Sequence, residues 1–246
     1  MRIIPVIDLM NGEVVHAVRG DRANYRPVQS VLADDAKPLS VARALQEATK
    51  CDEFYIADLD AIMGGQPQWN IIQEIANGVR AKLSVDAAIE DSAKAIKLIE
   101  AGAERAIVCS ETLRDLDESK AIRNALPGER LLFSVDVVKG RVLSRCPALR
   151  DVDPLVALDL MANQGWSRFI ILTLDQVGAG SGVDLSLLKA ANDRFPELSL
   201  IAGGGVRSPR DLRQLASINM SGVLIATSLH LGWITPLDLH DLGPQE

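Results

Sequence analysis

Cysteine and histidine are scarce in this sequence, with three of each among 246 residues. Cys51, Cys109 and Cys146 are far apart and form no C-x-x-C pair, a pattern typical of a reducing compartment rather than of a disulfide framework. The histidines are equally scattered, so no set of residues has the spacing of zinc ligands. The sequence therefore predicts neither a structural disulfide nor a bound metal.

Long apolar runs and an excess of positive charge are also missing. No apolar run approaches the roughly 20 residues that a membrane-spanning helix needs, and the apolar start of the chain reaches Asp8 too soon for a signal peptide. The 26 basic residues are outnumbered by 33 acidic ones, giving a net charge of −7 that disfavours a nucleic-acid partner. We expect a cytoplasmic protein without nucleic-acid or membrane partners, and no feature indicates its oligomeric state.

What the sequence does contain is the composition of a packed domain and a regular alternation. Hydrophobic residues make up 48% and charged residues 24%, as in ordinary globular domains. Short apolar runs, typical of parallel strands buried on both faces, are separated by amphipathic helical segments. Eight such runs are present, at 3–9, 53–59, 83–86, 105–109, 131–137, 168–174, 198–202 and 222–226. A unit of about 31 residues predicts an α/β fold, the (β/α)8 TIM barrel.

The two halves of the chain resemble each other, which favours the barrel over a doubly wound open sheet. Residues 5–15 align with 133–143, and in both segments an Asp is followed four residues later by a Gly. Residues 84–92 align in the same way with 201–209. We therefore predict one domain over residues 1–246, built as a half-barrel duplication with halves at about 1–127 and 128–246.

Two aspartates end the first and fifth predicted strands, Asp8 and Asp136. Strands one and five lie opposite each other in such a barrel, and active sites lie at the carboxyl ends of the strands. A substrate lying across the mouth would meet one carboxyl group on each side, as general acid–base catalysis requires. The alternative is structural, with each carboxylate capping the turn that follows it.

Three consecutive glycines follow the seventh predicted strand, and Ala226 and Thr227 follow the eighth. Glycines let backbone N–H groups approach a phosphate closely, and the loops after strands seven and eight are the usual phosphate position in barrels. We predict phosphate binding by Gly203, Gly204, Gly205, Ala226 and Thr227. A flexible turn is the alternative interpretation of the glycines.

Several of these motifs together resemble the histidine-biosynthesis HisA/HisF barrel family. They are found in this order over nearly the whole chain, at 4–15, 20–21, 58–61, Asp136 and 203–208. The resemblance implies a half-barrel duplication that binds a ribonucleotide with two phosphates, one held by each half. In the isomerase branch, it implies an Amadori rearrangement of an aminoaldose to an aminoketose without a cofactor. It further implies Asp8 as general base, Asp136 as general acid and Thr173 as an assisting group.

Loop residues at the same end of the predicted barrel are additional candidates for substrate contacts. They are Arg19, Asp60, Asp175 and Gly178. The aromatic residue that the resemblance leads us to expect over the substrate is missing from the loop after the fifth strand. The three tryptophans, Trp69, Trp166 and Trp233, are each expected to pack between helix and sheet.

The first half departs from the family pattern where a second phosphate would bind. The segment equivalent to 203–208 contains two alanines and three acids, and the partner of Ser228 is Glu111. Losing two charge-assisted hydrogen bonds would cost about 3 to 6 kcal/mol, and nearby carboxylates would repel a phosphate. We expect the second phosphate site to be absent, and whether this acidic segment binds any ligand stays open. Its acids are Asp86, Glu90, Asp91 and Glu111.

Three functions remain in view. The favoured one is a divergent acid–base enzyme, of the aldose–ketose isomerase type, acting on a substrate with one phosphate. The second is a true histidine-pathway isomerase whose altered half is compensated by Arg19, Arg22 or Lys139. The third is a barrel that binds a sugar phosphate without chemistry. A cyclase role has the least support.

Overall fold

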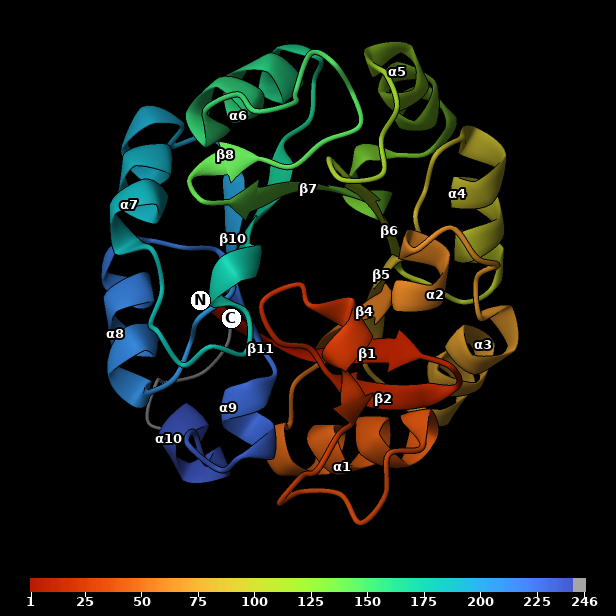
Figure 1. The fold of residues 1–246 in the computed structure, drawn as a ribbon, viewed down its shortest axis with the longest axis vertical. Helices are drawn as coiled ribbons and strands as arrows, with labels where there is room; N and C mark the ends of the chain where they lie inside the picture. The colour runs from red at the N-terminus through yellow and green to blue at the C-terminus, as the bar shows by residue number, and fades with distance from the viewer. Residues whose placement is uncertain (241–246) are drawn as a thin grey trace.

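The computed structural model describes residues 1–240 as a closed barrel of eight parallel strands with helices outside it (Figure 1). Each strand pairs with the next, and the last strand pairs in parallel with the first, where Val223 lies opposite Ile3. The predicted TIM barrel is therefore confirmed, with all eight expected runs as strands. The barrel strands are β1 (Arg2–Met10), β4 (Glu53–Asp58), β5 (Lys82–Asp86), β6 (Arg105–Cys109), β7 (Leu131–Val138), β9 (Arg168–Thr173), β10 (Ser199–Gly203) and β11 (Gly222–Ile225).

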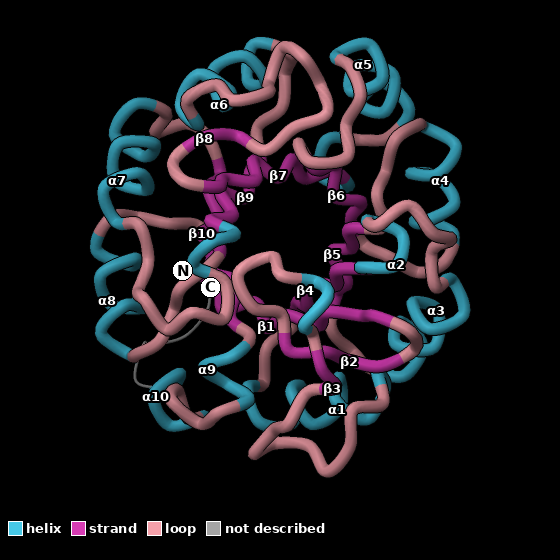
Figure 2. Tube along the Cα trace, in the orientation of Figure 1, coloured by secondary structure: helices cyan, strands magenta, loops and turns pink. Residues whose placement is uncertain are grey.

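Helices surround the barrel as an outer layer (Figure 2). The longer ones are α1 (Pro38–Thr49), α3 (Trp69–Gly78), α4 (Ser92–Glu100), α5 (Leu116–Ala125), α6 (Pro154–Asn163), α7 (Leu185–Arg194) and α8 (Pro209–Ser217), and short ones are α2 (Leu59–Ile62), α9 (Thr227–His230) and α10 (Pro236–His240). Within residues 1–240, no helix has the length and apolar character that a membrane span requires.

The core fills the barrel and the space between strands and helices. Phe54, Phe133 and Phe169 are fully buried. The Phe133 ring packs edge-on against Phe169 at 6.1 Å and against Trp166 at 5.2 Å. The Trp166 indole N–H donates to the Ser119 hydroxyl at 3.0 Å, so Trp166 packs between helix and sheet as expected.

Equivalent hairpins follow β1 and β7, the first strands of the two predicted halves. β2 (Glu13–His16) pairs with β1, and β8 (Arg141–Val142) pairs with β7. Both hairpins turn through two residues with positive φ, Asn11-Gly12 and Lys139-Gly140, the geometry of a type I′ turn. This repeated turn accords with the predicted duplication, whose half-barrel boundaries stay a prediction.

The first hairpin continues into an irregular segment that covers part of the mouth. It contains a 3-10 turn, η1 (Arg22–Asn24), and a two-residue strand, β3 (Arg26–Pro27), which pairs with β2. The Arg19 N–H donates to the Val177 carbonyl at 2.8 Å. This bond ties the segment to the loop after β9, beside the 3-10 turn η3 (Leu174–Gln176).

Candidate functional site

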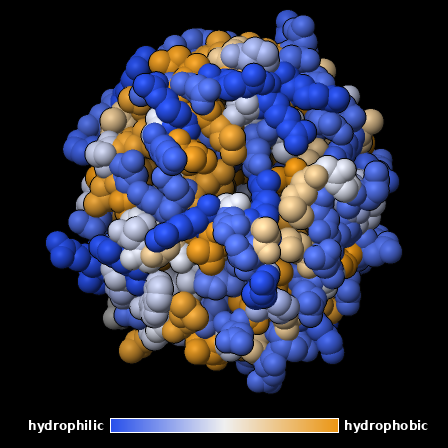
Figure 3. Space-filling view, in the orientation of Figure 1, coloured by the Kyte–Doolittle hydropathy of each residue, from blue (hydrophilic) through white to orange (hydrophobic). Residues whose placement is uncertain are grey.

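A cavity opens at the carboxyl ends of the barrel strands. Figure 3 shows the opening in the middle of this face, with hydrophobic surface along one side of it. Seven of the residues predicted from the sequence line this cavity: Asp8, Asp136, Gly178, Gly204, Gly205, Ala226 and Thr227. The fold therefore brings both aspartates and most of the glycine loop to one space.

Asp136, at the end of β7, is only 2% exposed and held by several donors. Its carboxyl oxygens accept from the Ser134 hydroxyl at 2.7 Å and from the Glu111 N–H at 3.1 Å. Burial, together with the negative charges of Glu111 and Asp86, raises the pKa of Asp136 to about 8. At neutral pH this group is mostly a protonated acid that can donate a proton.

Asp8, at the end of β1, differs from Asp136 in having no hydrogen-bond partner for its carboxyl group within residues 1–240. Burial raises the pKa of Asp8 to about 7, so about half of the molecules carry it ionised at neutral pH. Within residues 1–240 neither carboxyl group caps the turn after its own strand, because Asp8 accepts no bond there and Asp136 accepts from Ser134 in β7 and from the loop after β6. The structural alternative is thus not what the geometry shows.

The glycine loop after β10 has a backbone that only glycine fits. Gly204 and Gly205 have φ angles of 94° and 85°, in the left-handed region that disfavours other residues. A Cβ atom on Gly205 would also collide with the backbone oxygen of Gly182. Within residues 1–240, the Gly205 N–H has no hydrogen-bond partner, so it is available to an anion. Gly203 is the buried last residue of β10 and does not line the cavity.

His16, at the end of β2, contacts the predicted phosphate position and was not singled out from the sequence. Its Nε2 lies 3.0 Å from the Thr227 hydroxyl oxygen. Burial lowers the pKa of His16 below its usual value. The neighbouring Ser228 hydroxyl is buried, 1% exposed for the residue, and lacks a partner within residues 1–240. The loop after β11 thus presents two hydroxyl groups next to a histidine.

The equivalent loop in the first half shares one backbone feature with the glycine loop but has different chemistry. Ala88, which aligns with Gly205, also has a positive φ of 52°. Its N–H donates to the Asp86 carboxyl at 3.0 Å, and the Cys109 thiol donates to the other Asp86 oxygen at 2.8 Å. Burial is the main cause that raises the pKa of Asp86 to about 6. The Asp86 carboxyl group thus occupies the Ala88 N–H, which an anion bound to this loop would need as a donor.

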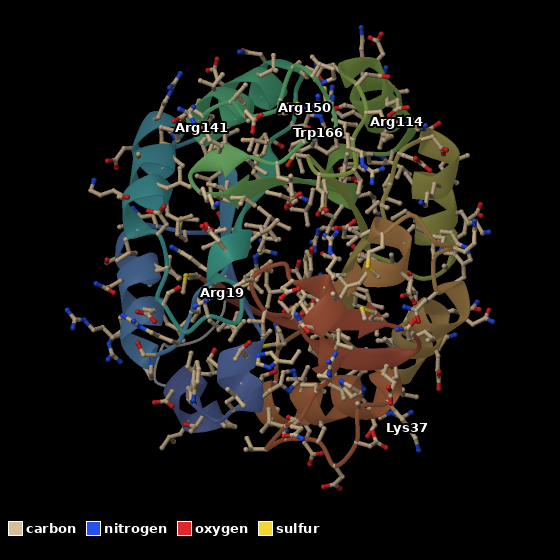
Figure 4. The ribbon with its side chains drawn as sticks, viewed as in Figure 1. Arg19, Lys37, Arg114, Arg141, Arg150 and Trp166 are labelled. Carbon is tan, nitrogen blue, oxygen red and sulfur yellow. The ribbon has the colours of Figure 1, made fainter. Side chains whose placement is uncertain are left out.

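Other predicted residues lie beside the cavity without lining it. Figure 4 shows Arg19 on the rim of the mouth. Asp60 accepts from the Asn11 N–H at 2.9 Å, and Asp175 accepts from the Lys139 N–H at 3.3 Å. Thr173 is buried, 7% exposed, at the end of β9, between two residues that do line the cavity. Substrate contact by these four residues stays a prediction.

Of the remaining acids in the first-half segment, only Glu111 lines the cavity beside Asp86. Its carboxylate pairs with Arg22 at 2.7 Å. Asp91 caps α4 by accepting from Lys94 N–H at 2.7 Å, and Glu90 pairs with Arg114 at 3.4 Å outside the cavity. Among residues 1–240 no group of three or more acidic, histidine or cysteine side chains has metal-site geometry.

Sequence reasoning missed the aromatic lining of the cavity. Both tyrosines of the protein, Tyr25 and Tyr55, line it and are 7% and 4% exposed. The expectation that Trp233 packs between helix and sheet is wrong, because it lies 44% exposed at the cavity. The chain reverses after α9 at Gly232, whose φ is 70°, and this turn carries Trp233 away from the helix layer.

The fold and this mouth define a TIM barrel with opposed carboxyl groups and a glycine-rich loop. The sequence profile of the histidine biosynthesis protein family matches residues 2–235, and the chain belongs to that family. An uncharacterized protein of Methanocaldococcus jannaschii is 31% identical, over 98% of this chain and 97% of its own length.

Two relatives carry the name 1-(5-phosphoribosyl)-5-((5-phosphoribosylamino)methylideneamino)imidazole-4-carboxamide isomerase. The protein of Gemmatimonas aurantiaca is 29% identical over 94% of both chains. The protein of Campylobacter jejuni is 26% identical over 93% of both chains. The predicted resemblance to this family is confirmed, and the chain is a divergent HisA-like member.

Proposed function

We propose that this protein is an isomerase that uses Asp8 and Asp136 as an acid–base pair on a sugar or ribonucleotide-like substrate carrying one phosphate. The observation that carries the proposal is the placement of both carboxyl groups on one cavity with pKa values of about 7 and about 8. Catalytic acids and bases work best when their pKa lies near the operating pH. The named relatives, which are isomerases, support the same reaction class.

The two aspartates have different roles because their surroundings differ. Asp136 holds its proton at neutral pH and is suited to protonate a sugar ring oxygen as the bond from that oxygen to C1 breaks. Asp8 has no bond to a protein donor within residues 1–240 and is suited to remove the C2 proton and return it to C1. The 2-hydroxyl proton leaves as C2 becomes a carbonyl carbon and restores the proton that Asp136 gave to the ring oxygen. Thr173, implied by the family resemblance, would assist from beside the cavity.

The phosphate would lie against the loops after β10 and β11. The Gly205 N–H is open to it, and Ala226 and Thr227 line the same part of the cavity. Close approach of backbone N–H groups to an anion is what glycine loops allow. His16 would act through Thr227, because their side chains are 3.0 Å apart.

An absorbance assay with the histidine-pathway aminoaldose bisphosphate, alongside aldose monophosphates, tests this proposal. We expect turnover of a monophosphate, lost in Asp8→Asn and in Asp136→Asn, and weak or no turnover of the bisphosphate. Full turnover of the bisphosphate would instead establish the histidine-pathway isomerase. Tight monophosphate binding without turnover of any substrate, in a folded protein, would identify a non-catalytic binding barrel.

A further inference from the structure

We propose that the cavity half opposite the phosphate loop binds a protonated amine, so that the substrate carries a phosphate at one end and an ammonium group at the other. This inference rests on the proposed function, because it concerns the second end of the same ligand. The half in question, called the acidic half below, consists of Asp86, Glu111, Asp136, Tyr25 and Tyr55.

Charge is the first argument. Four carboxyl groups line the cavity, those of Asp8 and of the three acids of the acidic half. Arg22 is the one basic residue among the described residues that line it, and its guanidinium is already paired with Glu111 at 2.7 Å. Carboxyl groups buried without enough positive charge are unfavourable. A cationic ligand would neutralise them.

The second argument is independent of the acids. Tyr25 and Tyr55 are each more than nine-tenths buried and line the same cavity. Neither phenol hydroxyl makes a hydrogen bond within residues 1–240, and neither is among the enclosed polar atoms that lack a partner there, so both hydroxyl groups open onto the cavity. A ligand in the cavity would satisfy them, since a phenol oxygen accepts from an ammonium group and an aromatic ring face attracts a cation.

The third argument excludes an anion from the acidic half. The Ala88 N–H is occupied by Asp86, and the Glu111 N–H is occupied by Asp136. A phosphate here would find these donors taken and would face carboxylates instead. At about 4 Å, repulsion between two unit charges is roughly 1 kcal/mol in bulk water and several times larger near a protein surface.

Release of protons on binding would distinguish an ammonium group held by carboxyl groups from a ligand held by apolar contacts alone. Burial raises the pKa of Asp86 to about 6, so this carboxyl group carries a proton in part of the molecules at neutral pH, whereas Asp136, with a pKa of about 8, keeps its proton for the acid role. An ammonium ion beside Asp86 favours the charged carboxylate of that residue. Binding of an amine at pH 7 should therefore release protons to the buffer.

Isothermal titration at pH 7 with three series of probes tests the inference. The probes are ω-aminoalkyl phosphates, ω-hydroxyalkyl phosphates and alkane bisphosphates, each with four to eight carbons. We expect the best aminoalkyl phosphate to bind about 10- to 100-fold more tightly than its hydroxyl counterpart, as one charge-assisted hydrogen bond allows. Titration in buffers of different ionisation enthalpy should show more protons released by each aminoalkyl phosphate than by its hydroxyl counterpart, since release from the phosphate is common to both.

Variants locate the preference in the acidic half. Asp86→Asn should remove most of the amine preference, and Tyr55→Phe should reduce it several-fold in case Asp86→Asn fails to fold. Glu90→Gln is the matched control, because Glu90 is an acid of the same loop that lies outside the cavity, and it should leave the preference intact.

The outcomes separate the two proposals. Equal binding of aminoalkyl and hydroxyalkyl phosphates, or tighter binding of bisphosphates, would overturn the amine inference and leave the single-phosphate isomerase standing. A preference that survives both Asp86→Asn and Tyr55→Phe would overturn it as well. If no phosphate ester binds at all, the proposed function fails, and the amine inference fails with it.

Discussion

The two halves of the barrel mouth share a residue with positive φ at equivalent loop positions and differ in what its N–H group offers to a ligand. Gly205 and Ala88 occupy equivalent loops with φ angles of 85° and 52°. The Gly205 N–H is open within the described residues, whereas the Ala88 N–H is held by Asp86. The comparison teaches that a neighbouring carboxylate can take the backbone donor at one of two equivalent loops, and we therefore predict anion binding at the Gly205 loop alone.

The largest expected effect is the loss of turnover when either of the two opposed aspartates is replaced. Asp8→Asn and Asp136→Asn should each lower kcat by about 10²- to 10⁴-fold, because each removes a proton-transfer group. Turnover of an aldose monophosphate would be measured, with circular dichroism to confirm folding. Glu90→Gln serves as the control and should keep wild-type kcat. Wild-type turnover in either aspartate variant would remove that residue from the acid–base pair.

A smaller effect is expected on the phosphate half. Gly205→Ala adds a Cβ that collides with the Gly182 backbone oxygen at a positive φ. The loop must shift, and losing one or two charge-assisted bonds should weaken binding of a phosphate monoester by about 10- to 1,000-fold. Titration calorimetry measures this change. Unchanged affinity would show that the phosphate lies elsewhere in the mouth.

The buried carboxyl groups of Asp8 and Asp136 should make the stability of the protein depend on pH. The folded-state pKa values of Asp8 and Asp136, about 7 and about 8, lie above their ordinary value of 3.8. The folded protein then binds more protons than the unfolded chain, so the free energy of unfolding falls as pH rises from 6.5 to 8, by up to about 1.4 kcal/mol per pH unit for each group.

The histidines act in the opposite direction, because burial lowers the pKa of His16 and of His230 below 6.5. Their opposing slope fades as pH rises past the unfolded-state value of about 6.5, so the part of the window above about pH 7 reports the carboxyl groups. Urea unfolding at several pH values measures the slope, and Asp136→Asn should flatten it. A free energy of unfolding that rises over this window would contradict the burial of protonated carboxyl groups at the mouth.

The smallest expected effect comes from a substitution that makes the Ala88 loop more like the Gly205 loop. Ala88→Gly places glycine at the positive φ of 52°, which relieves backbone strain and should change stability by no more than about 1 kcal/mol. It should not create phosphate binding, because Asp86 still occupies the N–H. Thermal unfolding and phosphate titration check both points, and new phosphate affinity would show that the alanine side chain, not Asp86, closes this half.

The strands, the two aspartates and the glycine loop could be predicted from sequence because their signals are local. Apolar runs mark the strands, Asp8 and Asp136 lie near the carboxyl ends of β1 and β7, and Gly205 lies just beyond the end of β10. The repeat then sets which strands face each other. These features require no knowledge of how the loops fold.

The rest of the cavity wall depends on contacts between distant loops. Tyr25 reaches the cavity from an irregular segment fixed by the bond from Arg19 N–H to Val177 and by the bond from Val31 N–H to His230. Trp233 reaches it through the reversal after α9. Asp60 and Asp175 were placed at the correct end of the barrel, but each accepts a bond from a hairpin N–H rather than lining the cavity.

The central claim is that the mouth has one phosphate site and not two. A crystal structure of the protein soaked with tungstate, a heavy-atom analogue of phosphate, tests it most directly because anomalous scattering locates each ion. We predict one ion against the Gly205 and Thr227 loops and none against Ala88. An ion of comparable occupancy at the Ala88 loop would contradict the account.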